Sequence, residues 1–346
     1  MSDHPPIEFF GNPSSPYSRK MLALLRYRRI AHRVMWGSAA NAPEGYPRPK
    51  VGLLPTFYFP DGEGRLEAVV DSTPIARRLE EEHAGRSVIP PDPELAFYAA
   101  LIEDYADEWL TKPMFHYRWH HEEDREHAGR FLAFTSDTTL AGDTAEAAAS
   151  AFTKRQFERL YVVGSSDNTA SLIEASYERI VALLDDALTS HCFLFGTRPS
   201  IADFAIYGQM TQLGLVDPTP RRLALKNAPR LEAWIWMTDD LSGLDCPEDG
   251  WVDAESAHTH LGPLLSEIGR TYLPVLIANA KAVMAGEDQF TAELSDGEWT
   301  QPTFPYQAKC LAALRDHFEA LPDAPRAAVA DTLAAHDCAA LIEGLT

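Results

Sequence analysis

Short apolar runs alternate with a stretch at helical spacing in the N-terminal part of the chain. Ile7 to Phe10, closed by Gly11, is short and apolar and predicts a strand. Tyr17 to Arg29 predicts a helix, because its apolar residues recur at helical spacing. Ala31 to Trp36 predicts a second strand. The chain therefore opens with a β-α-β unit, which a loop rich in proline and glycine follows over Pro43 to Pro49.

A hairpin comes next. Thr56 to Phe59 predicts a strand, and Pro55 precedes it at the position where a strand needs no backbone donor. Asp61-Gly62-Glu63-Gly64 is typical of a hairpin turn. Leu66 to Val70 is then the returning strand.

A second helix completes this unit. Asp71-Ser72-Thr73-Pro74 predicts its start, with Ser72 or Thr73 as N-cap and an end near His83. Ala84 to Pro93 predicts a linker, because three prolines stand at its end. The element order is β-α-β and then β-β-α, and we expect residues 1–85 to form one domain.

From Glu94 to about Leu244 the chain predicts only helices. The expected helices are Glu94 to Trp119, Thr144 to Val163, Ser171 to Leu188, one beginning at Ser200, and Pro229 to Leu241. Ser200 followed by Asp203 is typical of a capping box, so we assign Asp203 a folding role and not a catalytic one. We expect residues 94–244 to form an all-helical domain.

The pattern changes after Asp245. The expected elements are a helix over His260 to Met284, a hairpin over Phe290 to Gln301, and two helices over Tyr306 to Leu321 and Arg326 to Glu343. We expect residues 245–346 to form a mostly helical C-terminal extension.

Composition narrows the class of protein. The chain has 346 residues, of which 45% are hydrophobic, as in a globular protein. A net charge of −21 disfavours nucleic acid and anionic membranes as partners. The apolar runs are too short to cross a bilayer, and Met1 to Pro6 has no signal-peptide pattern. Four cysteines without a C-x-x-C pair suit a reducing cytoplasm and argue against a structural zinc site.

The stretch from Asn12 to Lys20 joins the first strand to the first helix. Pro16 fits the first helical turn, and Ser14 or Ser15 is the natural N-cap. The free N–H groups and the positive dipole end of a helix favour an anion at this place. Residues 1–50 carry eight Lys and Arg against three acidic residues, which also suits a small anionic ligand. Considered alone, the stretch predicts an ordinary capped helix.

Four histidines gather in one region: His116, His120, His121 and His127. His116 and His120 are four residues apart, a spacing compatible with a metal ion. No Glu stands between them as in H-E-x-x-H, however, and the charged neighbours are typical of a solvated helix. We therefore expect no metal site here.

Four motifs occur in a specific order: Ser15-Pro16-Tyr17-Ser18-Arg19-Lys20, Leu54-Pro55-Thr56, Asp71-Ser72 and Ser200-Ile201-Ala202-Asp203. Together they resemble the cytosolic glutathione S-transferase superfamily. They are similar to its helix-1 active-site turn, its cis-proline element, its pair for the γ-glutamyl end of glutathione, and its core-helix capping box. The first motif is also similar to the glutaredoxin Cys-Pro-Tyr-Cys motif with both cysteines replaced by serine.

The resemblance covers about residues 5–244 and implies a thioredoxin-like domain followed by a helical domain. It also implies a homodimer that uses glutathione as co-substrate. Ser15 is the first candidate to donate a hydrogen bond to the glutathione sulfur, Ser14 the second and Ser18 the weakest. The residues implied to bind the rest of glutathione are Leu54 beside a cis Pro55, Asp71, Ser72 and Arg19. We expect Lys20 to face solvent.

The resemblance further implies an acceptor pocket for a hydrophobic electrophile. Its expected lining is Tyr17, Trp36, Tyr105, Trp109, His116 and Trp119. The implied reaction is attack of the glutathione thiolate on a small electrophile, and the missing cysteines argue against disulfide reduction. Two alternatives stay open: a non-catalytic binding or scaffold protein of the same fold, and a glutathione-dependent lyase or isomerase such as a β-etherase.

The C-terminal extension, residues 245–346, has no counterpart in a typical member of the superfamily. It is able to cover the acceptor site, occupy the usual dimer surface or contact a partner, and the sequence does not choose among these roles.

Overall fold

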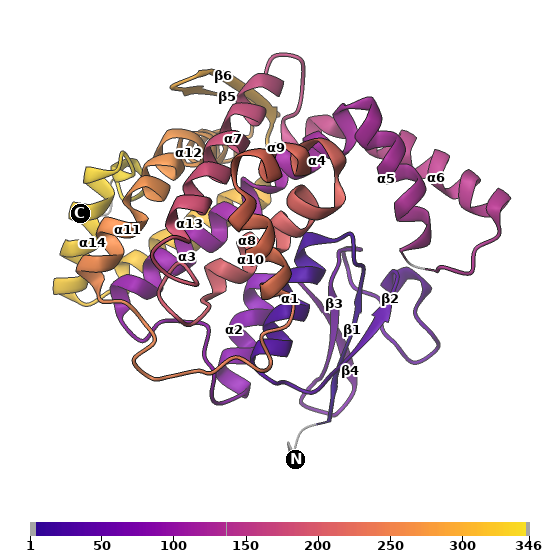
Figure 1. Ribbon diagram of the computed structural model, residues 1–346, viewed down its shortest axis with the longest axis horizontal. Helices are drawn as coiled ribbons and strands as arrows, with labels where there is room; N and C mark the ends of the chain where they lie inside the picture. The colour runs from indigo at the N-terminus through magenta and orange to yellow at the C-terminus, as the bar shows by residue number, and fades with distance from the viewer. Residues whose placement is uncertain (1–4, 136, 344–346) are drawn as a thin grey trace.

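The N-terminal unit of the computed structural model is a four-stranded mixed sheet, as the sequence predicts (Figure 1). The structure describes residues 5–135 and 137–343, so Met1 to His4 of the N-terminal segment lie outside it. The strands are β1 (Ile7–Gly11), β2 (His32–Trp36), β3 (Thr56–Pro60) and β4 (Leu66–Val70). Their order is β2-β1-β3-β4; β1 and β2 run parallel, and the other pairs are antiparallel.

Alternation along the strands divides the sheet into two apolar faces. Phe9 and Phe57 stack at 4.6 Å and join the core formed with α1 (Pro16–Tyr27) and α2 (Ser72–Glu82). Phe10 and Tyr58 point to the opposite face, where Ala39 covers them. This arrangement is a thioredoxin-like fold, and it confirms the predicted element order.

A helical part follows, as predicted. Its helices are α3 (Pro93–Glu108), α4 (Thr111–His120), α5 (Glu122–Phe134), α6 (Gly142–Phe157), α7 (Ala170–Ala187), α8 (Ile201–Thr211), α9 (Pro218–Asn227) and α10 (Pro229–Thr238). A π-helical turn, Gln212–Val216, joins α8 to α9. None of the described helices is both long and apolar enough to cross a membrane.

The single helix expected over residues 94–119 is divided into α3 and α4. Pro113 explains the break. It has no N–H for the carbonyl of Trp109, and its ring would collide with that carbonyl in a continuous helix. The chain therefore turns at Trp109 and Leu110 and restarts as α4.

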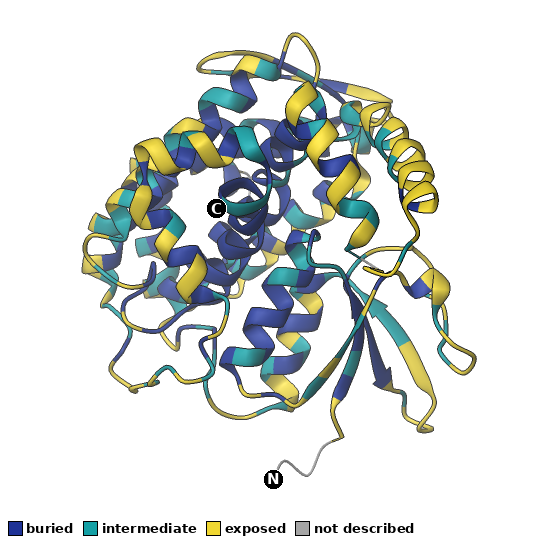
Figure 2. Ribbon diagram, turned by 45° about the vertical axis from the view of Figure 1, so that its right-hand side comes forward, coloured by how far each residue is buried: buried dark blue, intermediate teal, exposed yellow. Residues whose placement is uncertain are grey.

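Helix α8 is the centre of the molecule, and all its residues are buried. The predicted capping box is confirmed: the Ser200 hydroxyl accepts from the Asp203 N–H, and the Asp203 carboxylate accepts from the Ser200 N–H. Figure 2 shows buried positions on the central helices and exposed positions on the outward faces of the peripheral ones.

The C-terminal extension is helical with one hairpin, as predicted. It comprises α11 (Ala254–Glu267), α12 (Leu273–Ala285), β5 (Gln289–Leu294), β6 (Gly297–Pro302), α13 (Pro305–Glu319) and α14 (Asp323–Ala335). A π-helical turn, Ile268–Tyr272, divides the helix expected over residues 260–284. Helices α13 and α14 both pack against α3. The division into residues 1–85, 94–244 and 245–346 stays a prediction.

A glycine sets the approach of α1 to α8. A Cβ atom at Gly208 would lie 2.5 Å from the carbonyl oxygen of Pro16 and 3.1 Å from Cβ of Lys20. We expect Gly208→Ala to lower the free energy of unfolding by about 1–3 kcal/mol, because the two helices must separate. Chemical denaturation measures this, with the exposed Gly243→Ala as control, since a Cβ there meets nothing within 4 Å. Equal effects of both substitutions would contradict the tight contact.

Candidate functional site

The turn before α1 presents one partly exposed serine hydroxyl whose proton has no acceptor in the described chain. Ser15 is the N-cap of α1, and its Oγ accepts from the Ser18 N–H at 3.2 Å. Pro16 occupies the first helical turn, as predicted. Within the described ranges, the Ser15 O–H has no acceptor, and the residue is partly exposed. Ser15 therefore combines a helix N-terminus with a free hydroxyl donor that solvent reaches.

The neighbouring Ser14 is placed differently. Its side chain is buried, and its Oγ has no hydrogen-bond partner among the residues described. Its carbonyl accepts from the Arg118 guanidinium at 3.0 Å, and the Gln212 amide donates to the carbonyl of Pro13 at 3.2 Å. Arg118 is buried and pairs with Asp217 at 2.9 Å. Two distant side chains therefore hold this turn, and sequence reasoning missed both because no local pattern marks them.

The cis-proline prediction is confirmed, since the Leu54–Pro55 bond is cis. The hydroxyl of Thr56 donates to the carbonyl of Leu53 at 2.7 Å, which holds the loop beside it. Leu54 itself forms no backbone hydrogen bond to any part of the chain that the structure describes. Its N–H and C=O are thus available to an extended ligand.

Asp71, and not Ser72 or Thr73, is the N-cap of α2, which corrects the predicted cap. Its φ of 84° turns the chain sharply, and its Oδ1 accepts from the Thr73 N–H at 3.3 Å. Its Oδ2 accepts from the phenol of Tyr306 on α13 at 2.5 Å. The C-terminal extension therefore reaches a residue predicted to bind glutathione.

Ser72 faces the interior. It is buried, its Oγ accepts from Lys20 Nζ at 3.3 Å, and it lies 3.5 Å from Asp107 Oδ2. The predicted exposure of Lys20 is wrong: its ammonium is fully buried between Glu103 at 2.7 Å and Asp107 at 2.6 Å. Burial lowers the pKa of Lys20, but these two carboxylates outweigh it and raise that pKa.

Helix α3 carries a run of carboxyl groups beside this lysine, and burial raises the pKa of three of them. The pKa values are about 6 for Asp107, about 7 for Asp104 and about 8 for Glu108. The Tyr272 phenol donates to Asp104 at 2.5 Å, and the Gln307 amide donates to Glu108 at 3.0 Å. The extension thus supplies donors to carboxyls that the packing has removed from water.

Arg19 does not point toward the turn. It pairs with Asp239 at 2.5 Å, and it donates to the Tyr207 phenol at 2.8 Å. Both partners belong to the helical part or the chain directly after it, so Arg19, which was expected to help bind glutathione, makes structural contacts instead. Arg28, at the C-cap of α1, is also buried and pairs with Glu80 at 2.7 Å.

The predicted pocket residues separate into two groups. Trp36 is exposed at the end of β2, and Tyr17 is partly exposed and donates to the carbonyl of Asp107 at 2.8 Å. The other four, Tyr105, Trp109, His116 and Trp119, are at most 1% exposed. That burial corrects the predicted lining, because core side chains present no surface to an acceptor.

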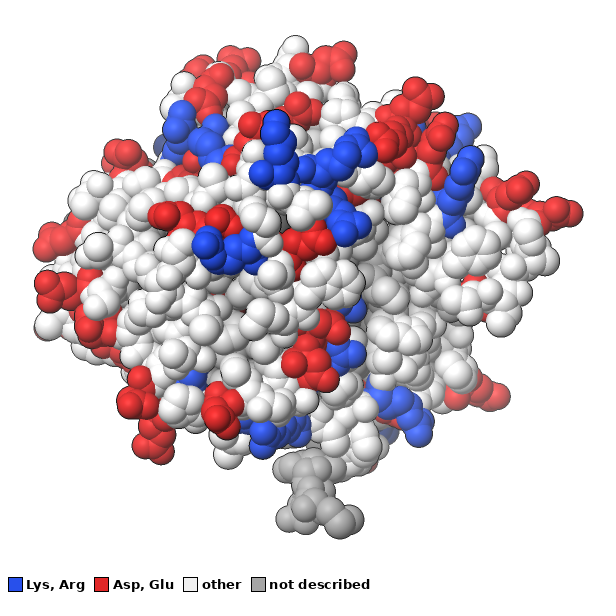
Figure 3. Space-filling view, in the orientation of Figure 1, with Lys and Arg blue, Asp and Glu red and all other residues white. Residues whose placement is uncertain are grey.

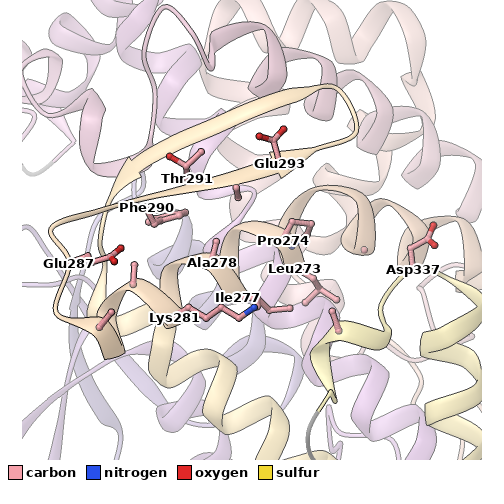
Figure 4. A pocket seen from close by; sticks show the side chains of 15 residues that line it. Leu273, Pro274, Ile277, Ala278, Lys281, Glu287, Phe290, Thr291, Glu293 and Asp337 are labelled. Carbon is pink, nitrogen blue, oxygen red and sulfur yellow. The ribbon is translucent and has the colours of Figure 1, made fainter.

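A cavity of about 640 Å³ lies elsewhere, between α12 and β5 of the extension (Figure 4). Leu273, Ile277, Ala278 and Phe290 give it apolar walls, and Lys281 stands beside them. None of the predicted site residues lines it. The face of the molecule in Figure 3 carries basic side chains interleaved with acidic ones, and no continuous basic surface appears on that face.

Residues 9–87 match a family model described as "Glutathione S-transferase, N-terminal domain". No curated protein matches the chain.

Similar solved structures include a glutathione S-transferase from Methylobacterium radiotolerans in complex with glutathione sulfonate. It is 17% identical, with a TM-score of 0.41 and coverage of 72% of this chain and 100% of that one. A Tau class glutathione S-transferase from mango is 14% identical, with a TM-score of 0.40 and coverage of 73% and 95%. A glutathione transferase from Burkholderia graminis with two bound glutathione molecules is 18% identical, with a TM-score of 0.41 and coverage of 72% and 92%.

Glu108 gives a pH-dependent prediction. Its pKa is about 8 in the folded chain against an ordinary 4.5, so the folded state keeps a proton that the unfolded state loses. The stability that this proton provides is complete below pH 4.5 and is lost as the pH rises toward 8. We expect Glu108→Gln, which cannot ionise, to gain about 2–4 kcal/mol over the parent chain across this range.

Denaturant unfolding at several pH values measures this difference. Glu123→Gln is the control, because Arg222 lowers the pKa of that exposed carboxyl. Its substitution is expected to cost stability above pH 4.5, and the cost disappears as the pH falls. A pH-independent difference for Glu108→Gln would show that Glu108 ionises equally in both states.

Proposed function

We propose that this chain, whose residues 9–87 match a glutathione S-transferase N-terminal domain, is a glutathione-dependent transferase. In this proposal it binds glutathione at the turn before α1 and stabilises the thiolate there. The thiolate then attacks a small hydrophobic electrophile. The proposal includes a homodimer in the cytoplasm, and a solution mass measurement tests the dimer.

The observation that carries the proposal is the state of Ser15. A thiol has a pKa of about 8.5, so only a small fraction is nucleophilic at neutral pH. The Ser15 Oγ already accepts from the Ser18 N–H, which fixes its orientation and leaves the O–H proton undonated. A sulfur anion placed at this N-cap gains that O–H and the positive end of the α1 dipole. Both interactions stabilise the charged form and lower the thiol pKa.

Ser15 fits this role better than Ser14. The Ser14 Oγ is also unpartnered within the described chain, but it is buried and a ligand cannot reach it without a rearrangement. Ser18 is buried as well, and its Oγ accepts from the Asn12 N–H at 3.1 Å.

The backbone of Leu54 supports the placement of the peptide part of glutathione. Its N–H and C=O have no partner in the described chain, next to a cis Pro55 that ends the loop before β3. An extended peptide satisfies such groups by pairing as an added strand. The cysteinyl residue of glutathione then lies between Leu54 and the turn before α1.

The γ-glutamyl end meets a different situation. Asp71 has one oxygen on the Thr73 N–H and the other on the Tyr306 phenol, and the Ser72 hydroxyl faces Lys20. A carboxylate oxygen accepts more than one hydrogen bond, so an ammonium still finds acceptors on Asp71. Ser72, however, offers its hydroxyl only after a change in the buried network.

That placement of Ser72 favours a second candidate, a non-catalytic binding or scaffold protein of the same fold. In this case the Lys20 network that holds Ser72, together with the Tyr306 contact to Asp71, closes the γ-glutamyl position. A glutathione-dependent lyase or isomerase, such as a β-etherase, uses the same thiolate as the transferase. A screen of electrophiles separates those two reactions.

Substitution of Ser15 tests the proposal. We expect the parent chain to be retained on immobilised glutathione and to show thiolate absorbance of bound glutathione near neutral pH. Ser15→Ala is expected to reduce the thiolate signal and the transfer rate about 10- to 100-fold, because a hydrogen bond to a charged group is lost. Absence of glutathione binding by the parent chain would overturn both the transferase and the lyase.

Two controls accompany this experiment. Ser15→Thr keeps both the hydroxyl donor and the cap, so it is expected to restore the signal. Ser14→Ala removes a buried hydroxyl that has no partner among the described residues, and it is expected to leave glutathione binding unchanged. Thermal unfolding of each variant measures the loss of the cap itself, about 0.5–2 kcal/mol for Ser15→Ala.

Tyr306→Phe separates the transferase from the scaffold. The substitution removes the phenol from Asp71 Oδ2 and keeps the aromatic ring in place. If the γ-glutamyl ammonium binds Asp71, the freed oxygen is expected to tighten glutathione binding several-fold, as measured by calorimetry. No binding by either the parent chain or the variant would favour the scaffold. Pro305→Ala, next to it and exposed, is the control for a general change in α13.

A further inference from the structure

Two helices that are distant in the sequence bring three metal-ligating side chains together. His116 lies near the end of α4, His121 follows that helix, and Glu174 lies on α7. Glu174 Oε1 lies 3.3 Å from His116 Nε2 and 3.0 Å from His121 Nε2. All three ligand atoms lie within 4.8 Å of one another.

These separations suit a small divalent cation. Zinc binds nitrogen and oxygen at about 2.0–2.2 Å, so a tetrahedral centre places neighbouring ligand atoms about 3.3–3.6 Å apart. The contact of Glu174 with His116, at 3.3 Å, falls in this range, and its contact with His121, at 3.0 Å, lies just below it. Two imidazoles and one carboxylate are a ligand set typical of zinc, and they leave a fourth position for water.

One of the ligand atoms lacks a hydrogen bond. His121 Nε2 is buried and lies 3.0 Å from Glu174 Oε1, yet it forms no hydrogen bond within residues 5–135 and 137–343. A buried nitrogen without a hydrogen bond has an unmet capacity for a partner. A cation coordinated by both His121 Nε2 and Glu174 Oε1 meets it.

A second contact fixes the orientation of His116. Its Nδ1 lies 2.8 Å from the hydroxyl of Ser165, which is itself buried. When Nδ1 donates to that hydroxyl, the lone pair of Nε2 points toward Glu174. Such an outer hydrogen bond is typical of a metal-bound histidine.

Aromatic rings pack against both histidines. The His120 ring stacks on His116 at 4.5 Å, and the Tyr117 ring stacks on His121 at 5.4 Å. Charged side chains near this cluster include Asp167, Arg125, Glu178 and Asp124.

We infer that His116, His121 and Glu174 form a binding site for a divalent cation of the zinc class. The site is independent of glutathione binding, and it differs from the expectation of no metal, which considered only ligands on one helix. The side chains of His121 and Glu174 are 33% and 36% exposed, which gives the cation a path from solvent. A cation bound at this site joins α4 to α7 through His116 and Glu174. Arg118, two residues after His116 on α4, holds the turn at Ser14.

Zinc titration of the chelator-treated full chain tests the site. We expect one equivalent to bind by competition with a chromophoric chelator, and Co²⁺ in its place to give the absorption of a four- or five-coordinate centre. His121→Ala and Glu174→Gln are each expected to weaken zinc binding by more than about tenfold, because loss of even an outer-shell partner has that effect.

Two controls keep the test specific. His127→Ala removes an exposed histidine on α5, and Glu178→Gln removes an exposed carboxylate on α7, so both are expected to bind zinc as the parent chain does. Circular dichroism checks that each variant is folded. If His121→Ala does not fold, Glu174→Gln alone tests the loss of a ligand. Absence of stoichiometric binding, or equal binding by the ligand variants and the controls, would overturn the site.

Discussion

The ammonium of Lys20, buried between Glu103 and Asp107, is the interaction on which the rest of the structure depends. It belongs to α1, whereas both carboxylates belong to α3, so it joins the sheet-bearing unit to the helical part. A buried charge is tolerated only when it is paired and hydrogen-bonded, and here the Ser72 hydroxyl adds a further contact. The same pairing turns Ser72, which we propose as a residue for the γ-glutamyl end of glutathione, away from the surface.

The C-terminal extension continues this polar network. Tyr306 donates to Asp71, Gln307 donates to Glu108, and Tyr272 donates to Asp104. Without these donors the carboxyls of α3 would be buried with fewer partners, which is costly in a medium of low polarity. The extension thus donates hydrogen bonds to carboxyl groups of the first two parts of the chain. Its removal would leave these carboxyl groups with fewer donors.

Helix α4 connects the two candidate sites. Arg118 on this helix holds the carbonyl of Ser14, and His116, two residues earlier, faces Glu174 on α7. The turn before α1 therefore has rigid support from the helical part, while the Ser15 O–H at its tip finds no acceptor among the residues that the structure describes. A site of this kind, with a supported backbone and an unpaired donor, is suited to stabilise an anion without reorganisation.

The sequence by itself determined the order of elements along the chain, an N-cap at Ser14 or Ser15, the capping box of α8 and both hairpins. These features depend on residues a few positions apart, so hydrophobic period, capping and turn chemistry are sufficient to predict them. Only the tertiary structure decided that Lys20 is buried and that Tyr306 contacts Asp71. It also decided that Glu174 lies beside His116, which is 58 positions away in the sequence. The physical reason is that the environment of a charge depends on partners from distant segments, which no local spacing records.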